Sequence, residues 1–162
     1  MSMKRMFLAV AVAVLILAPA GAARADEMLQ GVDAGDFEFG IILGEPTGLS
    51  AKFWTSWNMA IDFGAAWSFQ NDGHFHIHGD YLFHNFDFID VDSGSLPVYF
   101  GIGARVRLQE DDSRVGIRIP MGLEYIMESY PVGFFLEVVP IVDIAPETEG
   151  DVNGGLGVRY IF

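Results

Sequence analysis

The segment Val98-Tyr-Phe-Gly-Ile-Gly-Ala-Arg-Val-Arg-Leu108 alternates strictly between two kinds of residue. Its even-numbered positions are all apolar, whereas the odd-numbered positions after Tyr99 carry glycine and the arginines Arg105 and Arg107. Successive side chains of a β-strand point to opposite faces. The spacing therefore predicts a strand with one apolar face and one face of charge and glycine.

The same alternation recurs along the chain, interrupted by short runs of Gly, Pro, Asn and Asp of the kind that form turns. The predicted strands cover residues 36–44, 48–55, 60–69, 74–85, 97–108, 115–125, 133–144 and 153–162. The sequence thus predicts an all-β fold, an eight-stranded antiparallel up-and-down barrel. Pro120 lacks an N–H and predicts a bulge in its strand. Trp54 falls among the charged positions, which predicts that it fills space near a rim or marks a change of register.

One face of every predicted strand is free of charge, and the opposite face collects the ionisable side chains. An eight-stranded barrel encloses room for little more than its own side chains, and the large apolar residues are too numerous to fit there. We therefore expect the apolar face to point outward to lipid and the charges to pair inside, where hydrogen-bonded partners offset much of the cost of burial. The predicted lumen charge network comprises Glu38, Lys52, Asp62, Asp80, Arg105, Arg107, Arg118, Glu124, Glu137, Asp143 and Arg159.

The predicted strands also have the length that a membrane barrel requires, since about 9–11 tilted residues cross the hydrocarbon layer. Aromatic residues near their ends are expected to form girdles at the two membrane interfaces. These are Tyr99, Tyr125, Tyr130, Tyr160, Trp57 and Trp67.

The N-terminal residues have the features of a cleavable signal peptide. Lys4 and Arg5 precede an apolar run over residues 7–20, and Ala23-Arg24-Ala25 supplies the small residues of a cleavage site. We expect residues 1–25 to be removed and residues 26–162 to form one barrel domain. The chain contains no cysteine, so the exported domain is expected to fold without disulfides.

The mature chain is strongly acidic. The full chain carries a net charge of −13, and losing Lys4, Arg5 and Arg24 with the signal peptide brings it to −16. A nucleic-acid partner is excluded by this balance, because nucleic-acid binding depends on basic residues.

The chain ends on the alternating run Gly154-Gly-Leu-Gly-Val-Arg-Tyr-Ile-Phe162. This end resembles the signal, here Tyr160 and Phe162, that the outer-membrane barrel assembly machinery recognises. Longer segments resemble an uncharacterised family of small bacterial outer-membrane β-barrel proteins from spirochaetes and proteobacteria. They are GIILGEPTGLSAKFW, GDYLFHNF, LPVYFGIGAR, VGIRIPMGLEY and FLEVVPIVDIAPETEGDVNGGLGVRYIF. The resemblance implies a barrel comparable to the membrane domain of OmpA or to OmpX, located in the bacterial outer membrane, and it transfers no catalytic residues.

Two constellations could carry chemistry. His74, His76, His78 and Asp80 alternate along one predicted strand, as Zn²⁺ ligands on one face would, but the expected spacing of about 6.6–7 Å favours hydrogen bonding in the lumen over a metal site. Ser50 and Ser68 fall on the charged face without the neighbours of a nucleophile. We therefore expect no catalytic residues, no metal and no cofactor.

The acidic runs at 110–112 and 147–151 are predicted to be solvated loop tips, with an alternative role in bridging divalent cations to lipopolysaccharide. The resulting hypothesis is a monomeric barrel with a closed, charged lumen and a structural or interaction role, in contact with outer-membrane lipid and lipopolysaccharide. A soluble lipocalin-like periplasmic carrier of an apolar ligand and a lipid-modifying outer-membrane enzyme remain alternatives.

Overall fold

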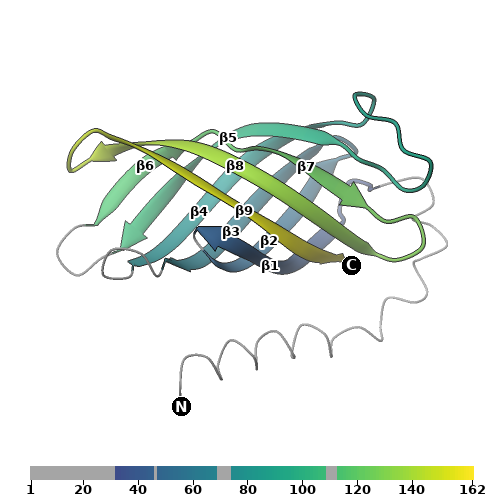
Figure 1. The fold of residues 1–162 in the computed structure, drawn as a ribbon, viewed down its shortest axis with the longest axis horizontal. Helices are drawn as coiled ribbons and strands as arrows, with labels where there is room; N and C mark the ends of the chain where they lie inside the picture. The colour runs from purple at the N-terminus through teal and green to yellow at the C-terminus, as the bar shows by residue number, and fades with distance from the viewer. Residues whose placement is uncertain (1–31, 46, 69–73, 109–112) are drawn as a thin grey trace, which may run out of the picture.

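The fold is taken from a computed structural model that describes residues 32–45, 47–68, 74–108 and 113–162 (Figure 1). The strands are β1 (Phe37–Glu45), β2 (Thr47–Ser56), β3 (Met59–Ser68), β4 (His74–Asn85), β5 (Val98–Leu108), β6 (Arg114–Arg118), β7 (Met121–Ile126), β8 (Val132–Ala145) and β9 (Glu149–Ile161). Within these residues, no helix is long and apolar enough to cross a membrane.

The strands form one closed antiparallel ring. Strands adjacent in sequence pair with each other, except β6 and β7, and the ring closes because β1 pairs with β9. β6 and β7 both pair with β5 on one side and β8 on the other, so they are two halves of a single barrel strand. The barrel therefore has eight strand positions, which confirms the predicted fold class.

The break between β6 and β7 follows from two prolines. Ile119 N donates to Pro140 O at 3.0 Å, and Gly101 N donates to Pro120 O at 2.8 Å. Neither proline has an N–H to return the second bond of its pair. The predicted bulge at Pro120 is wrong, because Gly103 pairs with Arg118 before the break and Phe100 pairs with Met121 after it, in unchanged register.

Register shifts occur at two other places. One lies between Trp54 and Ser56 in the pairing of β2 with β3, and the other lies between Val115 and Gly116 in the pairing of β6 with β8. The predicted association of Trp54 with a change of register is confirmed. Trp54 shares the inward parity of Lys52 and is fully buried in the interior, and the shift follows it in the strand.

Apolar side chains cover the outside of the barrel. Phe100 and Ile102 are each 60% exposed and Leu156 is 59% exposed, although all three lie within strands. The interior holds the charged residues together with several large apolar ones of the same parity, including Leu82, Phe135 and Val139.

The predicted girdle position of Tyr99 is wrong, because its side chain is buried inside the barrel. The odd-numbered positions of β5 point inward, and Tyr99 is one of them. Trp57 and Tyr130 lie in exposed turns, as expected for rim residues.

The two ends of the barrel differ. We call the end with the C-terminus and the loop over residues 86–97 the terminal end, and the opposite end, where β1, β3, β5 and β8 finish, the hairpin end (Figure 1). An apolar cluster fills the terminal end. It consists of Val32, Trp54, Ala60, Ile126 and Ile161, with Phe86 packed against it.

The predicted assembly signal lies at the terminal end. The Phe162 ring packs 4.9 Å from the ring of Tyr160 and 6.1 Å from that of Phe37, and Phe162 N donates to Phe37 O at 2.8 Å. Phe162 is 42% exposed. Both aromatic residues thus lie where β9 pairs with β1 to close the ring.

Candidate functional site in the charged lumen

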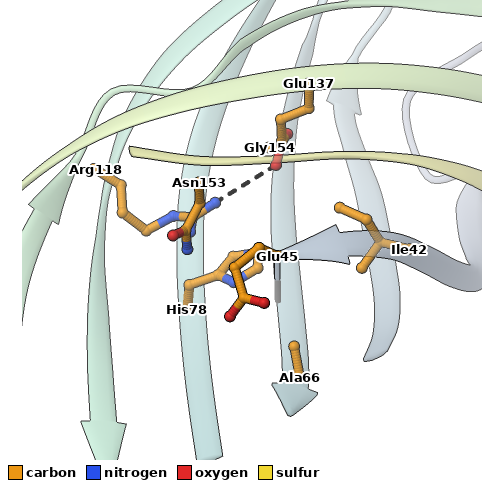
Figure 2. A pocket seen from close by; sticks show the side chains of 8 residues that line it. All are labelled: Ile42, Glu45, Ala66, His78, Arg118, Glu137, Asn153 and Gly154. Atoms are coloured by element: carbon orange, nitrogen blue, oxygen red, sulfur yellow. Dashed lines mark ion pairs between the residues drawn. The ribbon is translucent and has the colours of Figure 1, made fainter. Parts of the chain in front are cut away.

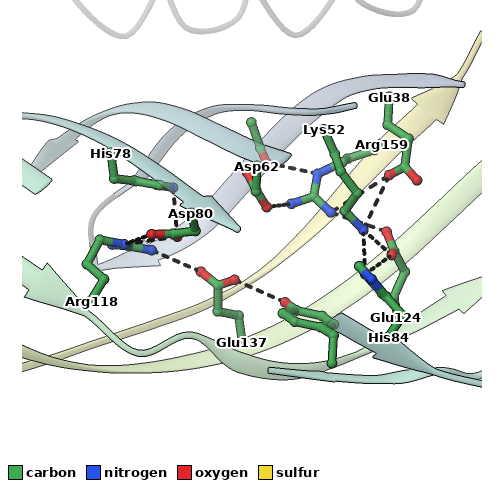
Figure 3. A network of polar contacts seen from close by, with 12 residues as sticks. Glu38, Lys52, Asp62, His78, Asp80, His84, Arg118, Glu124, Glu137 and Arg159 are labelled. Atoms are coloured by element: carbon green, nitrogen blue, oxygen red, sulfur yellow. Dashed lines mark hydrogen bonds and ion pairs between the residues drawn. The ribbon is translucent and has the colours of Figure 1, made fainter. Parts of the chain in front are cut away.

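Arg159 on β9 is the centre of a buried network of ion pairs (Figure 3). Its Nη2 lies 2.7 Å from Asp62 Oδ2, and its Nη1 lies 3.2 Å from Glu124 Oε1. Its Nε donates to Ser50 Oγ at 2.9 Å, and the guanidinium stacks 3.8 Å from the centroid of the Phe135 ring. The guanidinium therefore joins β3, β7 and β2 to its own strand.

Lys52 on β2 adds the second cation of this network. Its Nζ bonds to Glu124, lies 3.9 Å from Glu38 Oε2 and contacts His84 Nε2 at 3.4 Å. The Trp54 indole donates to Glu38 Oε1 at 2.5 Å and lies under the Lys52 ammonium, 4.9 Å from Nζ. The carboxylates Glu38 and Glu124 are thus each shared between Lys52 and Arg159.

Arg118 on β6 forms a second cluster toward the middle of the barrel. Its Nε lies 3.0 Å from both carboxylate oxygens of Asp80, and its Nη2 lies 3.6 Å from Glu137 Oε1. The Tyr99 hydroxyl donates to Glu137 Oε2 at 3.0 Å. Because Tyr99 also lies beneath the Lys52 ammonium, the two clusters are joined through its side chain.

A third cluster lies at the hairpin end. Arg105 donates to Asp143 through Nε at 3.0 Å and through Nη2 at 2.8 Å, and the same Nη2 bonds to Asp151 at 2.9 Å. Arg114 pairs with Glu149 nearby. The predicted loop tip at 147–151 is therefore wrong in its second half, because Glu149 and Asp151 belong to β9. The other acidic run, 110–112, lies outside the described residues.

The structure places the predicted lumen charges inside the barrel, and all of them except Arg107 are buried. Sequence reasoning missed His84, Tyr99 and Asp151 as members of the network. Alternation could have found His84, since it shares the parity of Asp80 on β4. All three residues lie close to a strand end.

The histidines of β4 contact one another. His78 Nδ1 lies 3.2 Å from His76 Nε2, and His78 Nε2 is 4.0 Å from Asp80 Oδ2. The side chain of His74, like that of Ser68, lies outside the described residues. In the part of the chain that the structure describes, no group of three or more His, Asp or Glu residues is arranged to hold a metal ion.

A small pocket lies in the lumen between the second cluster and the hairpin end (Figure 2). Its volume of about 10 Å³ is close to the room that one water molecule needs. The pocket is lined by Ile42, Glu45, Ala66, His78, Arg118, Glu137, Asn153 and Gly154. At this level the lumen is filled by side chains.

Removing the indole donor tests the contribution of Trp54. Trp54→Phe leaves Glu38 Oε1 without its hydrogen bond, and an unsatisfied buried acceptor costs about 1–3 kcal/mol. We expect urea unfolding of the refolded protein in detergent to show a loss of this size. Trp57→Phe, at a turn position that is 60% exposed, is the control and should change stability by less than about 0.5 kcal/mol. Equal stability of the two variants would contradict the role assigned to the Trp54–Glu38 bond.

The fold resembles that of a solved protein. The N-terminal β-barrel domain of Pseudomonas aeruginosa OprF superimposes with a TM-score of 0.66 at 13% sequence identity, over 81% of this chain and 100% of that chain. No protein-family model matches the chain, and no curated protein is similar to it in sequence. The comparison establishes the barrel fold, whereas the resemblance to the spirochaete and proteobacterial family stays a prediction.

Proposed function

We propose that the mature chain spans the bacterial outer membrane as a small barrel with a closed lumen and a structural or interaction role. The observation that carries this proposal is that apolar side chains lie on the outside of the barrel and charged side chains on the inside, the reverse of the arrangement in water-soluble proteins. Phe63, Leu136 and Leu156 are each more than half exposed, while Arg118 and Arg159 are buried. Water disfavours such a continuous apolar belt, and hydrocarbon favours it. A soluble carrier of the lipocalin type has less support, because its apolar residues would line the interior.

Cell fractionation tests the location. We expect the protein in the outer-membrane fraction. Its intact mass should match a chain that begins at Asp26, after cleavage of the signal peptide. A folded barrel should also migrate differently on a gel before and after boiling. Recovery in the periplasmic extract would instead support the soluble carrier, and altered lipid A on overexpression would support the lipid-modifying enzyme.

The closed lumen is tested by conductance in planar bilayers. Three clusters of ion-paired side chains fill the interior, and the apolar cluster around Trp54 occupies the terminal end. We expect no steady channels at neutral pH from the refolded protein. Regular channel openings under these conditions would refute the closed lumen without affecting the membrane location.

A charge placed on the outer face distinguishes lipid from water. Val138 lies in the middle of β8 and is 52% exposed. In a bilayer, Val138→Arg should destabilise the barrel by about 2–4 kcal/mol, as measured by urea unfolding in lipid vesicles. Tyr130→Arg, in an exposed turn, should cost less than about 0.5 kcal/mol. A water-facing position would tolerate both changes equally.

We propose that outer-membrane lipid and lipopolysaccharide surround the apolar outer face of the barrel. The outer-membrane barrel assembly machinery is the proposed partner of Tyr160 and Phe162. The exposed ring of Phe162 supports this assignment. We expect Phe162→Ser to lower the amount of assembled barrel in cells several-fold while leaving refolding in detergent intact. Loss of refolding in detergent would show instead that Phe162 acts in the folded structure.

A further inference from the structure

The interior of the barrel contains more acidic than basic side chains. Away from the hairpin end, five carboxyl side chains of the described residues are at most 5% exposed. They are Glu38, Asp62, Asp80, Glu124 and Glu137. Three basic side chains of the described residues are buried among them, those of Lys52, Arg118 and Arg159. If all eight groups were ionised, five negative charges would face three positive ones, a net charge of −2 in this part of the lumen.

The remaining basic residues do not balance this excess. The chain has nine basic residues, of which three lie in residues 1–25 and six in residues 26–162. Three of these six lie at the hairpin end, namely Arg105, Arg107 and Arg114. Three acidic side chains pair with Arg105 and Arg114 there, those of Asp143, Asp151 and Glu149. The basic residues of the hairpin end are therefore matched by carboxylates of their own.

Among the five buried carboxylates, Glu38 lies farthest from its nearest cation (Figure 3). Its Oε2 is 3.9 Å from Lys52 Nζ and 3.8 Å from Arg159 Nη1. Both of these cations lie closer to Glu124 than to Glu38. Glu38 Oε2 is also buried without a hydrogen-bond partner among the described residues, and so is Asp62 Oδ1. Two buried carboxyl groups thus each leave one oxygen without a donor.

Such an excess of buried charge has to be neutralised. A buried ionised carboxylate that lacks a partner is so unfavourable that the group takes up a proton instead. A bound cation would need space, but the lumen pocket has a volume of about 10 Å³, and neither Glu38 nor Asp62 lines it. Within the described residues, no group of three or more His, Asp or Glu side chains is arranged to hold a metal ion. A proton needs no cavity.

We propose that the barrel takes up about two protons as it folds at neutral pH and holds them in the lumen, on the network around Glu38 and Asp62. The inference rests on the closed lumen proposed above, because water in an open lumen would solvate the charges instead. The network has five further titratable side chains, those of Glu45, His76, His78, His84 and Tyr99. Groups this close titrate together, so the protons belong to the network as a whole.

The proposal predicts that alkali destabilises the barrel. At pH 7.5–8.5 the carboxyl groups and histidines of the unfolded chain are almost fully deprotonated. The folded barrel then holds more protons than the unfolded chain, so a rise in pH favours unfolding. The unfolding equilibrium constant should increase by about tenfold per pH unit for each proton held, or about a hundredfold for two. Urea unfolding in neutral detergent at pH 7.5 and 8.5 measures this change.

Proton uptake is measured directly in a pH-stat. The urea-unfolded chain of residues 26–162 is injected into neutral detergent micelles without buffer at pH 7.5, and folding should consume about two protons per barrel. Sodium chloride is then replaced by choline chloride at equal ionic strength, which removes small cations. Uptake below about one proton per barrel, or stability that depends on sodium and not on pH, would overturn the proposal.

Variants locate the protons. Glu38→Gln removes one carboxylate and keeps an oxygen that accepts from the Trp54 indole, so uptake should decrease by about one proton per barrel. Asp62→Asn should have the same effect, and it serves as the second variant if Glu38→Gln does not fold. Glu147→Gln, in an exposed turn, is the control and should leave uptake unchanged. Heat-modifiable migration confirms that each variant is folded. Unchanged uptake in both lumen variants would contradict the assignment.

Conductance separates this inference from the closed lumen on which it rests. A barrel that conducts ions steadily has an open lumen, and both proposals then fail. A barrel that neither conducts ions nor takes up protons keeps its closed lumen, and only the present inference is refuted.

Discussion

Arg159→Met is expected to lower the free energy of unfolding by about 3–5 kcal/mol, because removing one partner of a buried ion pair leaves an uncompensated charge. The loss should be at the upper end of this range. Arg159 contacts three carboxylates, and Asp62 has no other cation within ion-pair distance among the described residues. The measurement is urea unfolding in detergent, followed by tryptophan fluorescence and by heat-modifiable migration.

Arg114→Met is the matched control, since it removes the same kind of side chain from the rim. Its partner Glu149 has a side chain that is 59% exposed, and ion pairs of this kind contribute about 0–1 kcal/mol. A loss for Arg159→Met that does not exceed that of the control would contradict the central role given to Arg159.

A second variant keeps the test decisive if Arg159→Met does not fold. Asp62→Leu combined with Arg159→Met removes both members of the pair, and replacing a buried ion pair by apolar groups is often neutral. The double variant should therefore fold to a larger fraction than the single variant. A double variant that is no more stable than the single one would show that Asp62 is not the carboxylate that depends on Arg159.

Alternation predicted most of the fold because the strands of the barrel obey it apart from the two register shifts. The predicted strand 74–85 coincides with β4, and most other boundaries agree within one or two residues. The clearest failure is β9, which begins at Glu149. Its acidic start looked like a solvated tip, yet Asp151 is held across the lumen by Arg105. Local composition does not reveal a partner that lies in a different strand.

Parity predicted which charged residues point into the lumen, but it did not predict which of them form ion pairs with each other. Arg105 selects Asp143 and Asp151, whereas Arg118 selects Asp80 and Glu137. These choices depend on strand register and on the tilt of the strands around the ring. For Tyr99, closeness to the end of β5 predicted an interface position, but its inward parity decides its place in the interior.

Substitution of an inward-facing glycine is expected to have a second large effect on the stability of the barrel. A Cβ at Gly64 would collide with the ring of His78, which is opposite on β4 and bonded to His76. Gly64→Ala is therefore expected to destabilise the barrel by about 1–3 kcal/mol through overpacking. Gly79 is the matched control on the adjacent strand, because a Cβ there would meet Phe63 at 3.6 Å, an ordinary contact.

The control variant should be more stable than the wild-type barrel. Gly79→Ala lowers the conformational entropy of the unfolded chain and should stabilise by up to about 1 kcal/mol. Adding His78→Ala to Gly64→Ala removes the colliding ring, so the double variant should lose less than the sum of the two single losses, as measured by urea unfolding. Strict additivity would mean that backbone contacts, and not the His78 ring, require glycine at position 64. Because the ring of His78 occupies the space that Gly64 leaves, glycine and bulky polar residues on neighbouring strands together fill the narrow lumen.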